Sequence, residues 1–156
     1  MYCARVELIK WFTPEQFNDA LSSWAWIGLD GKTPLFTSVF GDVFLGANDG
    51  VWWLDTIEGE LTREWDSLDE LEAELNTGAG QEKYLIAELA LALEAGGLLP
   101  GPGEIYDFSH PLVLGGELEV ENVEVTDMSV SLNILGQIHD QVRRIPPGAK
   151  VNIQFS

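Results

Sequence analysis

Two histidines, one cysteine and a large excess of carboxylates are the side chains of this sequence that could do chemistry. A nucleophilic site needs a base within hydrogen-bond reach of a serine, threonine or cysteine, and an acid that orients the base. His110 stands between Ser109 and Pro111, with Asp107 three residues earlier, but neighbours in a loop do not by themselves orient an imidazole. We interpret His110 as a structural or solvated residue, and His139 as a partly buried packing residue on a helix.

The sequence contains no pattern that is typical of a metal or cofactor site. Cys3 has no CxxC partner and no metal-ligand spacing, and the aspartates form no DxDxDG calcium loop. The Gly-Pro-Gly run at 101–103 lacks the Lys-Ser/Thr pair of a phosphate loop. We therefore expect no cofactor, no metal and no enzymatic activity.

A long stretch of the chain carries charge of one sign only. Between Lys83 and Arg143 there is no lysine or arginine but there are ten carboxylates, in a chain whose formal net charge is −18. Such a field repels nucleic acid and acidic membranes and attracts a basic partner. We expect neither nucleic acid nor membrane as a partner. Binding of a basic protein and plain solubility both remain as explanations of the charge.

Within this stretch, three glutamates alternate with two aliphatic residues over 117–121, a pattern that predicts a strand with its carboxylates on one face. Successive carboxylates on such a face lie about 6.5–7 Å apart, which suits a charged ladder better than a cation cage. An ordinary solvated strand face is the alternative interpretation. The predicted partner-binding residues are Asp107, Glu117, Glu119, Glu121 and Glu124.

The elements that must position these residues begin with a helix and an antiparallel meander. Thr13 followed by Pro14 is typical of a helix start. An Asn-Asp-Gly turn at 48–50 separates two apolar runs and predicts a hairpin. The predicted elements of this half are a helix over 14–24 and strands over 39–45, 51–55 and 60–65.

All six tryptophans fall in this first half. Trp52 and Trp53 are adjacent in a predicted strand, so their side chains point to opposite faces of the sheet. The other tryptophans near the first helix, Trp11, Trp24 and Trp26, are expected to seal that helix against the sheet.

The second half predicts helices and short strands. Ser67 and Glu70 form a capping-box pattern for a helix whose leucines at 68, 71 and 75 face inward. In the helix predicted over 81–95, the residues from Tyr84 to Leu93 include only one charge, Glu88, which predicts a buried, central helix. Asp127 is a candidate cap for the last helix, with apolar residues at 130, 134, 138 and 142. The predicted elements are helices over 67–76, 81–95 and 127–144, and strands over 104–108, 117–121 and 151–155.

These elements predict an α+β fold: a mainly antiparallel sheet with an N-terminal β-meander and about four packed helices, one of them central and buried. A chain of 156 residues fits one domain, so we expect a single α+β domain over 1–156. A single cysteine, with no signal-peptide pattern and no long apolar run, favours a cytoplasmic location. The oligomeric state is left open.

Several separated blocks of the sequence carry a resemblance: Phe40–Leu45, Val51–Thr56, Gly103–Phe108, Leu114–Gly116 and Leu132–Ile138. Together these blocks resemble one bacterial domain-of-unknown-function family. The resemblance spans roughly residues 8–150. It implies the fold of the C-terminal domain of immunity proteins that protect bacteria from type VI secretion DNase effectors, often after a separate N-terminal domain. We expect 156 residues to leave no room for that extra domain, so the toxin class is not carried over, and neither is any functional residue.

The acidic stretch and this resemblance together predict a cytoplasmic immunity protein that binds and neutralises a cognate antibacterial toxin. A nuclease toxin must present cations to hold phosphates, so an acidic protein can occupy its substrate groove. The toxin is expected to be basic. The alternative is a small enzyme or ligand-binding domain that uses the 100–116 loop, with Tyr106, Asp107 and His110 around a pocket, and that could reverse a toxin's modification.

Overall fold

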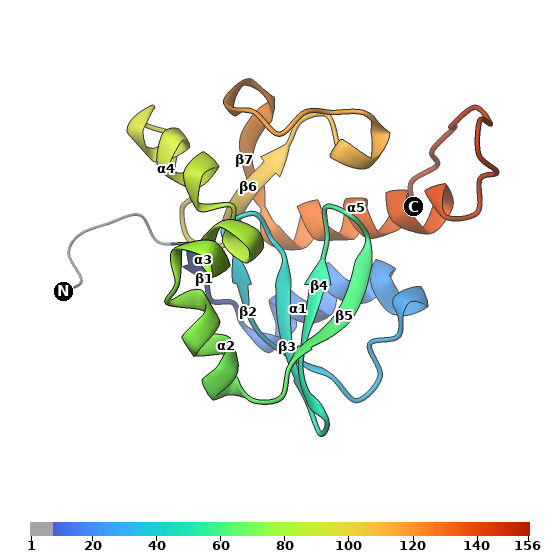
Figure 1. Ribbon diagram of the computed structural model, residues 1–156. Helices are drawn as coiled ribbons and strands as arrows, with labels where there is room; N and C mark the ends of the chain where they lie inside the picture. Colours follow the sequence, from blue (N-terminus) through green and yellow to red (C-terminus); the bar gives the residue numbers. More distant parts are fainter. Residues whose placement is uncertain (1–7) are drawn as a thin grey trace.

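The computed structural model describes residues 8–156, so Cys3 lies outside the described residues. Its centre is a five-stranded antiparallel sheet in the order β1-β2-β3-β4-β5, in which every strand pairs with its neighbour in the sequence (Figure 1). The predicted meander is confirmed, and it is extended by two strands at its N-terminal side. The strands are β1 (Ile9–Lys10), β2 (Thr33–Ser38), β3 (Val43–Ala47), β4 (Gly50–Asp55) and β5 (Glu60–Trp65).

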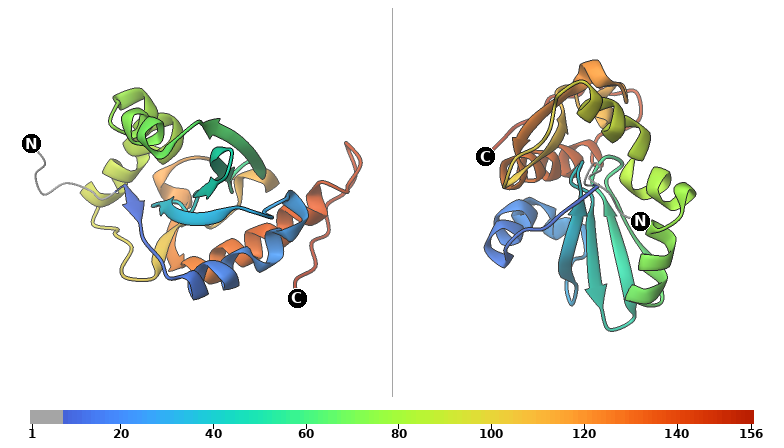
Figure 2. Two further views of the ribbon diagram at one scale, coloured as in Figure 1. Left: turned by 90° about the horizontal axis from the view of Figure 1, so that it is seen from below. Right: turned by 90° about the vertical axis from the view of Figure 1, so that its left-hand side faces the viewer.

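Helices cover both faces of this sheet. Figure 2 shows α1 and α5 on one side and α2 and α3 on the other, while α4 and a small hairpin of β6 and β7 stand at one end. The predicted α+β class is therefore confirmed. The remaining elements are α1 (Pro14–Leu21), a 3₁₀ helix (Ser22–Ile27), α2 (Leu68–Leu75), α3 (Gly78–Leu85), α4 (Ala87–Ala95), β6 (Glu104–Phe108), two 3₁₀ turns (Leu112–Leu114 and Val120–Asn122), β7 (Val123–Asp127) and α5 (Met128–Val142).

The two helices that cover one face of the sheet, α1 and α5, each begin at a residue whose side chain caps the helix. The Thr13 side chain accepts from the Gln16 backbone, and the Gln16 side chain accepts from the Thr13 backbone. Asp127 caps α5 by accepting from Val130 N at 3.1 Å, as predicted. These caps fix where α1 and α5 begin. The buried residues of the core on this face, the α1–α5 core, are Phe17, Ala20, Trp24, Val43, Leu45, Leu54, Ile105, Met128 and Leu132.

A second core lies on the other face of the sheet, because neighbouring strand residues alternate between faces. Trp52 packs against the α1–α5 core and Trp53 against the α2–α3 core, which confirms the prediction that their side chains point to opposite faces of the sheet. Both tryptophans are half-buried. A third cluster joins α4 to β6 and β7. The second core contains Phe36, Phe44, Val51, Trp65, Leu71, Tyr84 and Leu85, and the third contains Val39, Phe40, Ala90, Leu93, Tyr106 and Phe108.

The predicted central helix over 81–95 is wrong. The chain breaks at Ile86, which has a φ of +52°, and α3 and α4 are separate helices. The physical reason is that the apolar run serves two cores: Tyr84 packs under the sheet, whereas Ala90 packs against β6 and β7. A left-handed isoleucine costs about 1–2 kcal/mol, and burial on both sides of the break offsets this cost.

Among the described residues, no helix is long and apolar enough to cross a bilayer.

Two predicted strands near the C-terminus are also wrong. Residues 117–121 form a loop that runs into a 3₁₀ turn, and the strand that pairs with β6 is β7, in which Val125 lies opposite Tyr106. Residues 151–155 are not a strand. Instead, backbone groups of Gln154 and Ser156 bond to the side chains of Gln141 and Gln137 on α5.

Three predictions of inward-facing residues also fail. Trp11 does not seal the first helix: it is exposed and contacts Phe36 at a ring-centroid distance of 5.2 Å. Leu68 is half exposed, because it stands at the first position of α2. On α5 the apolar positions 130 and 134 are exposed, and the helix buries Met128, Ser131, Leu132, Gly136, Ile138 and His139 instead.

Candidate partner-binding loop

The segment 109–122 joins β6 to β7 and stands at the top of the molecule in Figure 1, at the opposite end from the β3–β4 turn. Glu117, Glu119 and Glu121 are all exposed in this segment. The aliphatic residues between them are exposed too, Leu118 by 51% and Val120 by 41%. The loop therefore presents apolar and anionic side chains together.

Asn122 fixes the shape of this loop. Its Oδ1 accepts from His110 N at 2.8 Å, and its Nδ2 donates to His110 O at 2.9 Å and to Glu117 O at 2.8 Å. The backbone of Ser109 donates to Asn122 O at 2.8 Å. One amide side chain thus ties the start, the middle and the end of the loop together.

Glycine is required at one point of the loop. A Cβ atom at Gly116 would lie 1.8 Å from the carbonyl oxygen of His110, so no other residue fits there without movement of the backbone. Gly115, with a φ of +103°, ends the preceding 3₁₀ turn in a conformation that favours glycine. The two adjacent glycines therefore form a turn that belongs to the fixed structure of the loop.

Within residues 8–156, the loop carboxylates form no ion pair. The ion pairs of residues 8–156 join Arg63 to Asp66, and Arg143 and Arg144 to Asp140, so none of them involves the loop. The loop therefore keeps its negative charge unneutralised.

The remaining two predicted site residues face each other across the hairpin. Asp107 and Glu124 are register partners on β6 and β7, and Glu124 is exposed whereas Asp107 is half-buried. Burial raises the pKa of Asp107, a hydrogen bond from Ser131 partly offsets this effect, and the Glu124 carboxylate raises the pKa further. Asp107 therefore points toward α5 and stands apart from the exposed loop glutamates.

The structure places Glu117, Glu119 and Glu121 in the exposed loop and Asp107 and Glu124 opposite each other on β6 and β7, so the five predicted residues do not form a ladder. The alternation over 117–121 predicted that Leu118 and Val120 would turn inward, and both are exposed instead. Sequence reasoning missed Asn122. Its position between the alternating run and the next strand is compatible with many loop geometries, so the sequence contained no specific signal for its role.

The residues of the alternative, pocket-based interpretation do not converge. Tyr106 is buried and donates to Leu98 O at 2.6 Å, while Asp107, the next residue of the strand, points to the opposite face. The exposed His110 ring lies 3.0 Å from Leu114 O. Over residues 8–156 there is also no group of three side chains that could hold a metal ion.

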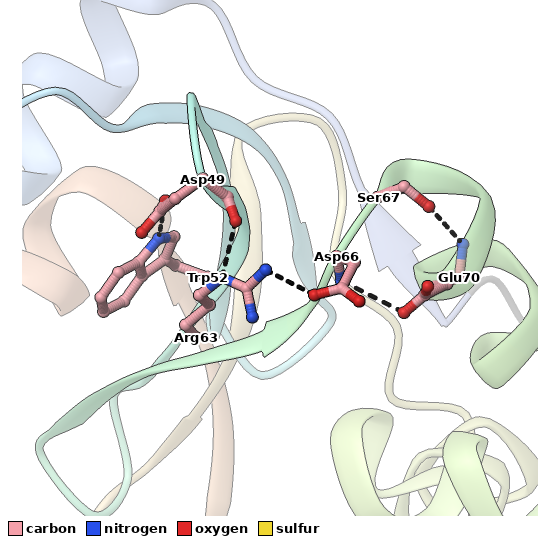
Figure 3. Close-up of polar contacts among 6 residues, drawn as sticks. All are labelled: Asp49, Trp52, Arg63, Asp66, Ser67 and Glu70. Carbon is pink, nitrogen blue, oxygen red and sulfur yellow. Dashed lines mark hydrogen bonds and ion pairs between the residues drawn. The ribbon is translucent and has the colours of Figure 1, made fainter.

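A second polar cluster lies at the far end of the sheet, around the β3–β4 turn (Figure 3). Trp52 Nε1 donates to Asp49 Oδ1 at 2.9 Å, and Arg63 Nε donates to the carbonyl oxygen of Asp49. Arg63 also pairs with Asp66, and Ser67 caps α2 by accepting from Glu70 N. The Glu70 carboxylate accepts from Asp66 N rather than from the Ser67 backbone, so the predicted capping box is only half formed.

This far cluster differs from the loop in one respect that matters for binding. Its Asp66 carboxylate is paired with Arg63, its Asp49 carboxylate accepts from Trp52, and Lys32 Nζ stands over the Trp52 ring at 4.2 Å. Its groups satisfy one another and hold the β4–β5 hairpin to the start of α2. We interpret it as a structural network.

The described residues thus combine an α+β fold with a fixed, exposed and acidic loop. Residues 66–139 match the family described as T6SS immunity protein Tdi1, C-terminal. This match confirms the predicted family resemblance over that part of the chain, which includes the whole 109–122 loop and helices α2, α3 and α4.

The solved structures to which this chain is similar support its fold and nothing further. The chain is similar to the protein of the "Crystal structure of Atu4351 from Agrobacterium tumefaciens", with a TM-score of 0.50 and 16% sequence identity. The similarity covers 83% of this chain but only 66% of that one. No curated protein matches the sequence.

Proposed function

We propose that this protein is a cytoplasmic immunity protein, acting as one α+β domain, that binds and neutralises a cognate antibacterial toxin of a type VI secretion system through the 109–122 loop. The observation that supports this proposal most directly is the exposure of Leu118 and Val120 among carboxylates that have no ion-pair partner in residues 8–156. The family match over residues 66–139 supports the class of partner.

The chemistry of the loop fits a basic protein surface. Exposed aliphatic side chains provide the apolar contact area at the centre of an interface, and the surrounding charges provide orientation and fast association. If the toxin is a nuclease, its phosphate-binding cations supply the complementary charge. Because Asn122 fixes the loop before binding, little conformational entropy is lost when the complex forms.

Charge reversal tests the proposal with the cognate toxin, which is sought in the open reading frame upstream of the gene. The triple variant Glu117→Lys, Glu119→Lys, Glu121→Lys changes the formal net charge from −18 to −12. We expect it to lower the association rate and to weaken affinity at least tenfold, with a weaker dependence on salt than the wild type. Surface plasmon resonance at two salt concentrations measures both quantities.

A matched control separates the loop from the overall charge. Asp19→Lys, Asp30→Lys, Glu60→Lys makes the same change in net charge at three exposed positions outside the loop. This control is expected to slow association only slightly. Equal losses in the two triple variants would show that general charge, not this loop, holds the toxin.

A further inference from the structure

A large apolar groove lies away from the loop, between the β1–β2 edge of the sheet and helices α2, α3 and α4, which follow one another along the left of Figure 1. Its volume is about 920 Å³. The floor is formed by the buried residues Phe36, Leu71 and Leu85. Neither the acidic loop nor the polar cluster of Figure 3 accounts for this groove.

The mouth of the groove is apolar as well. Trp11 is 68% exposed, Leu68 50% and Leu91 52%, and all three line the groove. A small molecule in the groove would cover the floor and leave much of these side chains in water. An occupant that covers them must extend beyond the groove, as a protein segment does, and large apolar patches of this kind mark protein contacts.

The charge around the groove identifies the chemistry of that segment. Helices α2 to α4 carry seven carboxylates and only one cation, Lys83. Glu72 lines the groove directly, and none of the ion pairs in residues 8–156 reaches it. Lys10, although it lies between two groove residues, points away and donates to Gly101 O at 2.8 Å.

The same charge disfavours a second copy of this chain as the occupant. Two chains of net charge −18 that meet at acidic helices repel each other, and among residues 8–156 no lysine or arginine lines the groove to compensate. A cationic segment is attracted by the same field.

We propose that this groove is a second docking surface, separate from the acidic loop, which takes an apolar segment of a partner protein that also carries lysine or arginine. The apolar side chains of the segment fill the groove between Phe36 and Leu71 and cover Trp11, Leu68 and Leu91. Its cations lie over the carboxylates of α2 and α4. The proposal does not depend on the loop binding a toxin, since the groove and the loop share no residue.

A fluorescein-labelled, 14-residue synthetic peptide with leucine and tryptophan on one helical face and lysine on the other tests the proposal by fluorescence anisotropy with the full chain. We expect the peptide to bind, and the double variant Leu68→Ser, Leu91→Ser to weaken binding at least tenfold. Leu99→Ser is the matched control, because Leu99 is 54% exposed and lies outside the groove. It is expected to change affinity less than twofold. All three leucines are exposed, so the variants should fold, and thermal unfolding checks this.

The same peptide with glutamate in place of lysine is expected to bind at least tenfold more weakly. The proposal is overturned if the lysine peptide does not bind, if the double variant binds it as well as the wild type does, or if the glutamate peptide binds equally. Sedimentation provides a further test: a wild-type dimer that the double variant converts to monomers would identify a second copy as the occupant. If removal of residues 2–7 tightened peptide binding tenfold, that segment of the chain would be the occupant instead.

Discussion

The side-chain amide of Asn122 holds both backbone groups of His110, with Oδ1 accepting from His110 N at 2.8 Å and Nδ2 donating to His110 O at 2.9 Å. The same Nδ2 also donates to Glu117 O. A loop tied in this way presents its glutamates and aliphatic residues in one arrangement. Its shape is then a property of the free protein, and binding does not have to create it.

Asn122→Ala removes these three side-chain hydrogen bonds without changing any charge. Each is worth about 0.5–1.5 kcal/mol net, and their loss falls on the loop rather than on the core. We expect faster amide hydrogen exchange over 110–122 and an affinity for the toxin about tenfold lower, with little change in global stability. Asn18→Ala on the exposed face of α1 is the control. Unchanged exchange in the loop would show that Asn122 does not fix its shape.

His110→Ala distinguishes binding from chemistry at the same loop. The imidazole contacts Leu114 O at 3.0 Å, and Tyr106 and Asp107 do not converge on it. Since the backbone of His110, not its ring, bonds to Asn122, the variant should keep the loop shape. We expect cells that express it to survive the toxin as well as cells with the wild type. A variant that still binds the toxin but no longer protects cells would instead indicate a reaction at His110.

Local chemistry explains which parts of the fold could be predicted from the sequence. Thr13 and Asp127 cap their helices as predicted, because a cap depends on residues within one turn. The β3–β4 hairpin follows from its Asn-Asp-Gly turn in the same way. These signals are complete within a few residues, so tertiary packing did not alter them.

The failed predictions concern residues whose environment is set by distant parts of the chain. The break at Ile86 exists because Tyr84 and Ala90 pack against different cores, which the run of apolar residues does not reveal. The alternation over 117–121 resembles a strand, yet β6 already has a partner in β7, which leaves Leu118 in solvent. The charge of the candidate site was visible in the sequence, whereas its shape depended on Asn122.

Gly136 marks the closest approach between α5 and the segment after α1. A Cβ atom at this position would lie 2.2 Å from Ser23 Oγ and 2.8 Å from the Trp24 ring. We expect Gly136→Ala to lower the free energy of unfolding by about 1–3 kcal/mol, because the buried Trp24 cannot move aside. Chemical denaturation measures this change. Gly78→Ala in α3, where an added Cβ meets nothing within 4 Å, is the control and should be neutral or slightly stabilising.

A buried polar chain links the sheet to α5 and gives stability a pH dependence. Asp42 Oδ1 accepts from Thr56 N at 2.8 Å and from Thr56 Oγ1 at 2.9 Å, and the His139 ring donates from Nε2 to Thr56 O at 2.8 Å. Burial, followed by repulsion from Asp55, raises the pKa of Asp42 to about 8. Burial lowers the pKa of His139.

The two shifts act on stability in opposite directions. Asp42 keeps a proton in the folded state up to about pH 8, whereas in the unfolded chain it loses that proton near 3.8, so its contribution falls as pH rises between these values. Burial lowers the pKa of His139 in the folded state below the 6.5 of the unfolded imidazole, so the unfolded chain takes up this proton first and the contribution of His139 falls as pH drops through 6.5. Between about pH 6.5 and 8 only the Asp42 effect of this pair operates.

Asp42→Asn should therefore flatten the pH dependence in that range. The amide oxygen can accept both hydrogen bonds from Thr56, and no charge has to form in the buried site when pH rises. For the wild type we expect the free energy of unfolding to fall by up to about 1.4 kcal/mol per pH unit between pH 6.5 and 8, as urea titrations at several pH values would show. Asp30→Asn, at an exposed position, should keep the wild-type slope. If Asp42→Asn and the wild type lost stability in parallel, the buried carboxyl would not be the group that titrates.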